Sequence, residues 1–302
     1  MSEVRLQQLQ ACLSLPVLTA EPMKLHTSFR IGGPADYFAR PTCVEELQRL
    51  LAVAKELELP VTIIGRGSNL LVQDKGIRGL VIQISNSMSE LEIKDTAMYC
   101  AAGVALAKAA QAAAKAGLTG LEFAAGIPGT MGGAVYMNAG AYDGEISRLV
   151  TAITAVDGFG NVVELTSADL NFSYRHSALM ENKLMVVSVK LKLDLGQETA
   201  IRAKMEDFQL ARKTKQPLEY PSAGSTFKRP AGYFAGTLID QSGLKGYRVG
   251  DAQVSTKHAG FVVNLGEATC ADVLQLISDV KAKVFQLHGV VLEPEVQIIG
   301  EA

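Results

Sequence analysis

The chain has 302 residues, of which 48% are hydrophobic and 20% are charged, and its formal net charge is -2. This length exceeds the size at which a single core usually stops growing, so two or three packed units are expected. The composition excludes a disordered chain. The near-zero net charge provides no field that would attract nucleic acid or an anionic membrane to the surface as a whole.

The sequence contains no apolar stretch long enough to cross a membrane. The most hydrophobic helix-like run, residues 104–117, is interrupted by Lys108 and Lys115. The amino terminus carries Glu3 and Arg5 among glutamines, so it does not resemble a secretory signal. We therefore expect a cytoplasmic protein with neither a membrane nor a nucleic-acid partner.

The cysteines are scattered, with no close pair and no histidine at ligand spacing, which argues against zinc or iron-sulfur chemistry. We expect no metal, and we expect reduced cysteines that mostly belong to the core. They are Cys12, Cys43, Cys100 and Cys270.

After a leader of residues 1–22, the pattern predicts a small β-α-β unit. Residues 36–40 are strand-like, residues 44–57 carry apolar side chains at helical spacing, and residues 61–64 form a second strand-like run.

A glycine-rich loop, Gly65-Arg66-Gly67-Ser68-Asn69, leads directly into the strand-like residues 70–72 rather than into a helix. This excludes a Rossmann turn, whose glycines open a helix, and a P-loop, which ends in Gly-Lys-Ser/Thr. The loop can still bind phosphate, because backbone N–H groups in a glycine-bent turn form an anion-binding nest. The alternative is that its glycines only form tight turns.

The middle of the chain contains the densest cluster of glycine and small residues, GLEFAAGIPGTMGGAVYMNAGAY, at 120–142. The strand-like residues 80–84 and 98–102 and an alanine-rich helix over 105–116 precede it, and Gly117 is expected to end that helix as a left-handed cap. So many small residues indicate that the backbone approaches something closely.

A composition shift near Gly196 marks the expected domain boundary, because a charged amphipathic helix follows it. Before the boundary, strands over 150–156, 162–165 and 184–193 close an α+β region. Beyond it we expect a helix over 199–213, a strand over 259–264, a helix over 271–287 and a strand over 291–299.

Five motifs occur in this order: GRGSN, AAGIPGTMGGAVYMNAGAY, YRHS, SAGSTFKRP and LEPEV. In this combination, from about residue 25 to residue 300, the chain resembles the UDP-N-acetylenolpyruvoylglucosamine reductases (MurB), in their shorter form. The resemblance implies an α+β fold, with a two-lobed FAD-binding region of the vanillyl-alcohol-oxidase (PCMH) type over 23–196. A smaller α+β substrate-binding domain follows over 197–302.

The resemblance further implies an NADPH-dependent flavoenzyme that reduces UDP-N-acetylglucosamine enolpyruvate to UDP-N-acetylmuramate for peptidoglycan synthesis. FAD would be bound non-covalently between the two lobes, with glycine-rich backbone holding its pyrophosphate. The matching positions are Gly65, Arg66, Gly67, Ser68, Asn69 and Leu70 in the first loop and Gly126, Ile127, Pro128, Gly129, Thr130, Gly132 and Gly133 in the second.

Three residues match the family's catalytic positions. Hydride addition to C3 of the enolpyruvyl group leaves negative charge at C2, so the reaction needs hydrogen-bond donors and an acid. The family's acid matches Ser225, and its enolate-supporting arginine matches Arg175, whose planar fork suits a carboxylate. The catalytic glutamate matches Glu295. On an extended segment Glu293 points to the same face, so spacing alone does not choose between the two.

Lys215 and Arg229 flank the serine segment and suit the UDP diphosphate of the substrate, and His258 is a candidate for the same cleft. Solvated surface cations are the alternative for both basic residues. Arg229 lies where longer family members carry an amide, which leaves its role open. The short carboxyl-terminal part has no room for the extra substrate-closing loop of the longer form. The expected oligomeric state, which sequence does not determine, is a monomer.

Two other functions remain open at this stage. A flavin oxidase of the same fold would need a substrate base in place of Ser225, and such relatives often tether the flavin to a histidine, which neither glycine-rich loop contains. A non-catalytic nucleotide-binding protein would keep the loops, but it would not need Ser225, Arg175 and Glu295 together.

Overall fold

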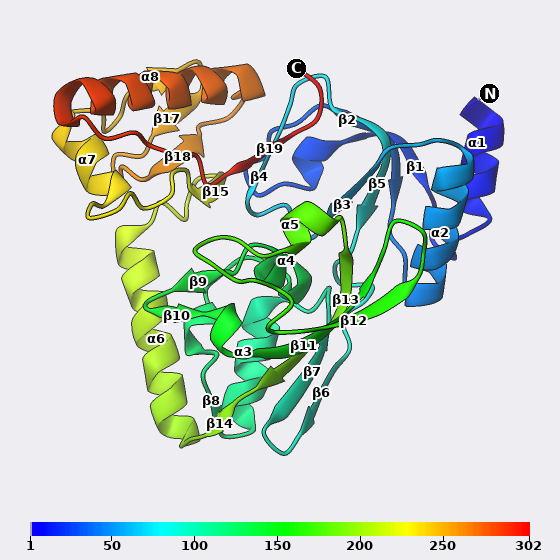
Figure 1. Ribbon diagram of the computed structural model, residues 1–302. Helices are drawn as coiled ribbons and strands as arrows, with labels where there is room; N and C mark the ends of the chain where they lie inside the picture. The colour runs from blue at the N-terminus through cyan, green and yellow to red at the C-terminus, as the bar shows by residue number, and fades with distance from the viewer. Residues whose placement is uncertain (1) are drawn as a thin grey trace. The chain divides into compact units, whose positions relative to one another are not determined.

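The computed structural model describes residues 2–302; Met1, the first residue of the predicted leader, lies outside them. The described chain forms two compact units, each assembled from separate segments (Figure 1). The first unit comprises residues 2–19, 37–66 and 79–211, and the second comprises residues 20–36, 67–78 and 212–302.

The first unit contains a five-stranded antiparallel sheet, on which the short helix α4 packs through its apolar side chains. The strand-like runs predicted at 98–102, 150–156, 162–165 and 184–193 are confirmed within one residue at each end. In sheet order the strands are β12 (Val162–Thr166), β11 (Val150–Val156), β13 (Met185–Lys192), β7 (Ala97–Ala101) and β6 (Leu91–Lys94), and α4 spans Met131–Tyr136.

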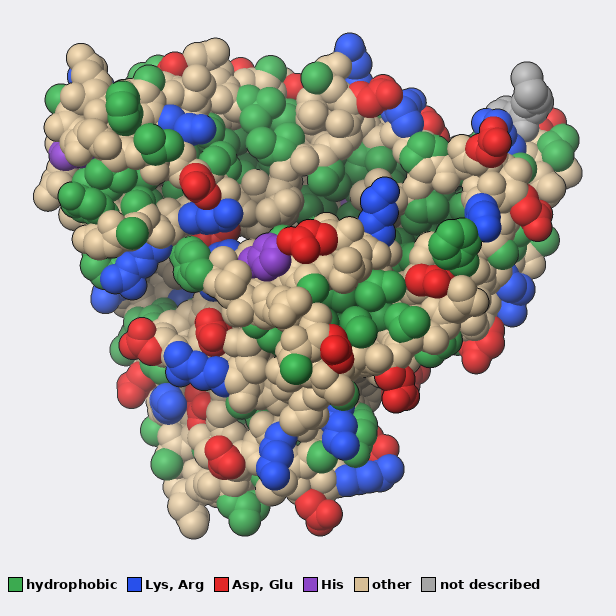
Figure 2. Space-filling view, in the orientation of Figure 1, with side chains coloured by type: hydrophobic (Ala, Val, Ile, Leu, Met, Phe, Trp, Pro, Cys, Tyr) green, Lys and Arg blue, Asp and Glu red, His purple; other side chains and the backbone are tan. Residues whose placement is uncertain are grey.

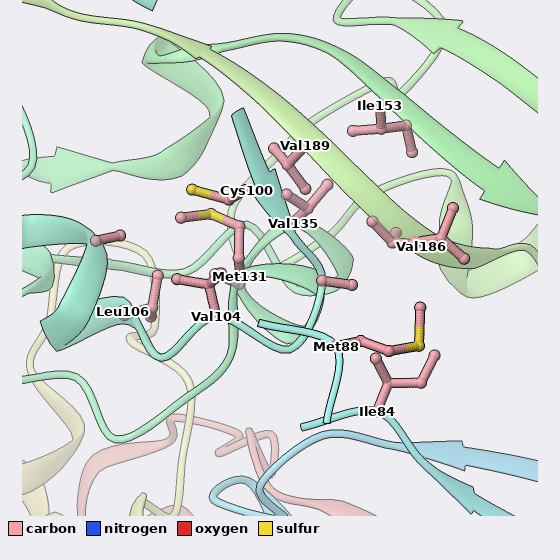
Figure 3. Close-up of a cluster of buried hydrophobic side chains, with 14 of the residues drawn as sticks. Ile84, Met88, Cys100, Val104, Leu106, Met131, Val135, Ile153, Val186 and Val189 are labelled. Carbon is pink, nitrogen blue, oxygen red and sulfur yellow. The ribbon is translucent and has the colours of Figure 1, made fainter. Parts of the chain in front are cut away.

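The core beneath α4 is shown in Figure 3, where Met131 and Val135 of the helix lie among side chains of the sheet. Cys100 of β7 and Val189 of β13 are neighbouring partners in the sheet and are both buried. Cys100 is therefore a core residue, as predicted, and its burial raises the pKa of its thiol to about 12. The position of α4 is therefore set by a continuous apolar core.

A four-stranded sheet contains the predicted β-α-β elements, but a further strand lies between the two expected neighbours. Its order is β1-β2-β5-β3, and β3 runs parallel to β5. Six of the seven residues of β5 are buried, which suits a central strand. The elements are β1 (Leu18–Pro22), β2 (Pro34–Ala39), α2 (Val44–Glu56), β3 (Val61–Ile64) and β5 (Ile77–Gln83).

The second unit contains a four-stranded antiparallel sheet, against which α8 packs, with α7 beside that helix (Figure 1). Its strands in order are β15 (Ser222–Ser225), β18 (Phe261–Asn264), β17 (Ala252–Val254) and β16 (Arg248–Val249), and the helices are α7 (Ala235–Gln241) and α8 (Cys270–His288).

The expected strand over 291–299 is shorter in the structure. Only β19 (Gln297–Ile299) forms, and it pairs in parallel with β4 (Leu70–Val72), the strand that directly follows the first glycine-rich loop. Pro294, which has no N–H to donate to a ladder, forms only an isolated bridge with Phe227. The segment before β19 is therefore held without regular strand pairing.

The predicted helices are confirmed within about two residues, and Gly117 ends α3 with a φ of 66° as expected. The pattern did not predict α1, α4 or α7, because short helices carry too few turns to show a period. The remaining elements are α1 (Ser2–Gln10), η1 (Met23–Leu25), α3 (Leu106–Lys115), β8 (Leu118–Thr119), η2 (Glu122–Ala124), β9 (Gly140–Ala141), β10 (Gly144–Glu145), η3 (Ile146–Arg148), α5 (Leu179–Asn182), β14 (Asp194–Leu195) and α6 (Glu198–Lys215).

The surface has no dominant charge on the face shown in Figure 2, where basic and acidic side chains are interspersed. Among residues 2–302, no helix combines the length and the apolar character that crossing a bilayer requires. The same residues contain no cluster of three His, Cys, Asp or Glu side chains that could hold a metal ion.

Glu122 is a buried carboxylate directly before the second glycine-rich loop. It accepts hydrogen bonds from the Thr119 hydroxyl and the Gly120 N–H, and the Lys204 ammonium of α6 lies 4.0 Å away. Burial alone would raise the pKa of Glu122, but the hydrogen bonds and the Lys204 charge outweigh it and hold the pKa below the ordinary value of 4.5. The ionised carboxylate therefore stabilises this segment.

We expect Glu122→Gln to lower the free energy of unfolding by about 1 to 3 kcal/mol at neutral pH, because two donors lose a charged acceptor. Because the folded pKa lies below the ordinary value, the contribution of Glu122 is present above about pH 4.5 and is lost as the pH falls further. Urea denaturation at several pH values measures both effects, with the exposed Glu92→Gln as control. Equal acid sensitivity of wild type and Glu122→Gln would contradict this account.

Candidate active site

The two glycine-rich loops touch within the first unit. A Cβ atom at Gly65 would lie only 2.6 Å from the Thr130 hydroxyl oxygen, so no larger residue fits there without a shift. The Gly65 carbonyl accepts a hydrogen bond from the amide of Gln83 at 3.1 Å, which fixes the end of β3. Gly65 and Thr130, which are 65 positions apart in the sequence, thus belong to one glycine-lined surface.

The N–H groups in the first turn of α4 donate to other groups of the protein. The Thr130 hydroxyl accepts from the Gly133 N–H at 3.3 Å and caps the helix. The N–H groups of Met131 and Gly132 donate to carbonyls in residues 102–104, each at 2.8 Å. A bound anion would therefore be held by the loop that precedes α4 rather than by the helix terminus.

The second half of the first loop belongs to the second unit and is tied to the carboxyl-terminal segment. Gly67 has a φ of 63°, and a Cβ there would lie 2.1 Å from the carbonyl oxygen of His26. The Asn69 side-chain amide donates to the Glu295 carbonyl at 3.0 Å, and the Gln297 N–H donates to the Asn69 carbonyl at 2.9 Å. Binding of phosphate by the Asn69 side chain stays a prediction.

These loops fit the pyrophosphate of FAD. Gly65 and Gly67 let the backbone turn where a side chain would collide, and Gly126 and Gly129 leave the second loop partly accessible. Ser68 is half-buried and offers a hydroxyl donor. Backbone N–H and hydroxyl groups can hold the negative charge of a pyrophosphate without a metal. Its binding at these loops stays a prediction.

Ser225 ends β15 in the second unit, with its side chain exposed. Gly224 before it has a φ of 78°, and the register with β18 shifts between Ser222 and Ser225. Thr226 after it is buried, and its N–H donates to the Gly260 carbonyl at 2.8 Å. The backbone is thus fixed on both sides of an accessible hydroxyl.

Glu295 lies on the segment that bonds to the chain just after this strand, where Phe227 and Pro294 form an isolated bridge. Its N–H donates to the Thr226 carbonyl at 2.8 Å, which brings the segments of Ser225 and Glu295 together in one unit. The alternative candidate Glu293 has a largely exposed carboxylate, 70% accessible and 3.4 Å from the ammonium of Lys228. Glu295 is only half-exposed. The two glutamates therefore differ in environment, which spacing could not reveal.

Arg175 belongs to the first unit and lies in a tight turn of residues 173–176. Its φ of 56° is in the left-handed region, which disfavours residues other than glycine. Its guanidinium donates to the Gly140 carbonyl at 3.0 Å and lies 5.0 Å from the centre of the Tyr174 ring. The planar group is thus held in one orientation.

Lys215, at the end of α6, and Arg229, in the loop after β15, are both exposed. The Arg229 guanidinium stacks on the ring of Phe234 at 3.9 Å. This stacking holds the plane of the guanidinium against the ring.

His258 also belongs to the second unit. Its Nδ1 accepts from the Gly260 N–H at 3.1 Å. Burial is the largest cause and lowers its pKa below the ordinary 6.5. A backbone hydrogen bond opposes this, and the charges of Lys245 and Lys215 add smaller lowering effects. A neutral ring with its proton on Nε2 is therefore expected at neutral pH. Sequence reasoning missed Lys245, because only the folded chain shows which charges surround this histidine.

Comparison with known proteins identifies the family. Residues 35–166 match the model of an FAD binding domain, and residues 216–299 match the model of the UDP-N-acetylenolpyruvoylglucosamine reductase C-terminal domain. The UDP-N-acetylenolpyruvoylglucosamine reductase of Agathobacter rectalis is 52% identical over 299 residues, covering 95% of each chain. The chain belongs to the UDP-N-acetylenolpyruvoylglucosamine reductase family. The enzyme of that name from Syntrophomonas wolfei is 48% identical, covering 93% of this chain and 94% of its own.

Solved structures support the predicted architecture. The crystal structure of UDP-N-acetylenolpyruvylglucosamine reductase (MurB) from Thermus caldophilus matches with a TM-score of 0.79 at 37% identity, covering 93% of this chain and 97% of that one. Berberine bridge enzyme matches 66% of this chain with a TM-score of 0.51 at 12% identity, which is evidence of shared fold alone. The predicted FAD-binding fold followed by a family-specific domain is confirmed.

We expect Gly65→Ala to weaken FAD binding by at least about tenfold, roughly 1.4 kcal/mol, because the new methyl group would displace the Thr130 hydroxyl. Titration of the deflavinated protein with FAD, followed by flavin fluorescence, measures the affinity. Gly158→Ala is the matched control, since a Cβ there meets nothing within 4 Å. Equal affinity in both variants would show that the contact between the loops does not shape the flavin site.

Proposed function

We propose that this chain reduces UDP-N-acetylglucosamine enolpyruvate to UDP-N-acetylmuramate at the expense of NADPH, with Ser225, Glu295 and Arg175 as catalytic residues. The observation that carries the proposal is the pairing of the Ser225 and Glu295 segments through the Thr226–Glu295 backbone hydrogen bond. An accessible hydroxyl and a half-buried carboxyl group on adjoining segments provide the acid and the donor that enolate chemistry needs.

FAD, when bound, supplies the hydride chemistry by taking a hydride from NADPH and passing it to C3 of the enolpyruvyl group. The task of the protein is then to handle the negative charge that develops at C2 and in the neighbouring carboxylate. The Ser225 hydroxyl donates its proton to C2, which completes the saturated lactyl product, and regains a proton from solvent. Its exposure at the end of β15 allows this approach.

The other two catalytic residues stabilise the developing enolate. The guanidinium of Arg175 donates to the oxygens that gain charge, in the planar geometry that suits a carboxylate. Glu295 acts in its protonated form, because an ionised carboxylate would repel the carboxylate of the substrate. A neutral carboxyl group can instead donate a hydrogen bond to the enolate oxygen.

Substrate recognition is assigned to three further residues of the second unit. Lys215 and Arg229 neutralise the diphosphate of the UDP group, and neutral His258 donates from Nε2 without adding charge. FAD is held by the loop backbone of residues 65–70 and 126–130, because the N–H groups of residues 131–133 are used inside the protein. Both proposed reactants, NADPH and a UDP-sugar, are nucleotides used inside the cell, which supports a cytoplasmic role. We also propose a monomer, with a domain boundary near residue 196.

We expect Ser225→Ala to leave the reduction of bound flavin by NADPH unchanged and to slow its reoxidation by the enolpyruvyl nucleotide by about 10²- to 10⁴-fold, the usual contribution of a positioned acid. Anaerobic stopped-flow absorbance of the flavin separates the two half-reactions. Ser222→Ala, on the same strand, is the control. Rapid reoxidation of wild type by oxygen but not by the nucleotide would favour a flavin oxidase, and a protein that binds no FAD would favour a non-catalytic role.

We expect Glu295→Gln to slow the same reoxidation step by about 10²-fold, because an amide is a weaker donor to a developing enolate than a carboxylic acid is. The alkaline limb of the pH-rate profile should also disappear, since the amide does not ionise. Glu293→Gln, two residues earlier and exposed beside Lys228, is the matched control and should behave as wild type. Full activity and an unchanged pH profile in Glu295→Gln would remove Glu295 from the mechanism.

A further inference from the structure

Asn138 is buried at the end of α4, with only 2% of its surface accessible. Both ends of its side chain are used: Nδ2 donates to the Ser173 carbonyl at 2.9 Å, and Oδ1 accepts from the Ser147 N–H at 3.1 Å. Asn138 itself has a φ of 45°, a conformation that asparagine tolerates better than most residues. This side chain therefore joins two segments that follow it in the sequence.

The first of these segments is the turn that carries Arg175. Ser173 and His176 exchange backbone hydrogen bonds of 3.1 and 3.2 Å across the turn. Arg175 inside it adopts the left-handed conformation. A residue with a Cβ persists there only when its surroundings hold the turn, because the isolated chain would relax to a more favourable conformation.

A second contact supports the same turn from the same side. The hydroxyl of Ser177, which is fully buried, donates to the Tyr136 carbonyl at 2.6 Å. The Arg175 guanidinium also donates to the Gly140 carbonyl. Residues 136–140 therefore contact the turn at Ser173, at Arg175 and at Ser177. All these groups belong to the first unit.

We propose that Asn138 is a positioning residue for Arg175: its amide holds the Ser173 carbonyl and thereby keeps the arginine in the left-handed conformation that aims its guanidinium. This inference rests on the proposed role of Arg175 in the reaction. The hydrogen bonds of the Asn138 side chain go to Ser173 and Ser147 and not to the arginine itself. Its effect is on the orientation of the guanidinium, and an error of about 1 Å there costs roughly 10²-fold in rate.

The sharpest test is Asn138→Asp, which keeps the shape and the acceptor for Ser147 but replaces the donor. When ionised, the new carboxylate repels the Ser173 carbonyl; when protonated, it can donate to it as the amide does. We expect reoxidation of the flavin by the enolpyruvyl nucleotide to be about 10- to 100-fold slower at alkaline pH, with recovery on acidification. Reduction by NADPH should stay at the wild-type rate at both pH values.

A double-mutant cycle with Arg175→Ala distinguishes positioning from general damage. If Asn138 acts through the arginine, Asn138→Asp should have little further effect once Arg175 is removed. If the double variant instead showed the product of the two single fold-decreases in reoxidation rate, the proposal would be overturned. Asn264→Asp is the control for a buried new carboxylate, since Asn264 is 1% accessible and also uses both ends of its amide. In Asn264→Asp, acidification should not restore the rate of flavin reoxidation in a way that depends on the presence of Arg175.

A second variant covers the case in which Asn138→Asp fails to fold. Asn138→Gly removes the donor without adding charge, and glycine accepts the positive φ; it should show the same slowing without pH recovery. Hydrogen exchange of a peptide spanning residues 173–177 provides a readout independent of activity. Faster exchange is expected in Asn138→Gly, and unchanged protection would overturn the inference. A wild type that does not react with the nucleotide would count against the proposed function alone, and the exchange experiment would still test the inference.

Discussion

Packing of α4 against the five-stranded sheet is the constraint on which the first unit's part of the site depends. Met131 and Val135 are buried in the core under the helix. At its start, Thr130 touches Gly65 and caps the helix. Just after its end, Asn138 holds the turn of Arg175. One short helix therefore supports both the glycine-lined surface at Gly65 and the turn that contains Arg175.

In the second unit, backbone hydrogen bonds hold the segments that carry the candidate site residues. Thr226 is buried, its hydroxyl accepts from the Val262 N–H at 3.0 Å, and its carbonyl accepts from the Glu295 N–H. Asn69 joins the first glycine-rich loop to the same carboxyl-terminal segment. The backbone of Thr226 and Glu295 is thus held by hydrogen bonds next to the exposed Ser225, which is the proposed acid.

Long segments with a clear period were predictable, because burial of one face imposes that period on the sequence. The helices over 44–57 and 271–287 and the strand over 150–156 follow this rule. The position of β5 in its sheet was not predictable, since strand order depends on pairing among distant segments. The short helix α4 has no period to detect: its glycines indicated close backbone approach and, through the family resemblance, a flavin-binding loop rather than a helix.

By itself the sequence determined the family and the flavin cofactor, because ordered motifs preserve the chemistry that a site needs. The catalytic roles of Ser225, Arg175 and Glu295 stay predictions. It could not separate the environment of Glu293 from that of Glu295, nor assign any role to Asn138 within its motif. Tertiary structure decided these points. The physical reason is that burial, hydrogen-bond partners and backbone strain arise from contacts such as Asn138 with Ser173, 35 residues apart, which no local pattern encodes.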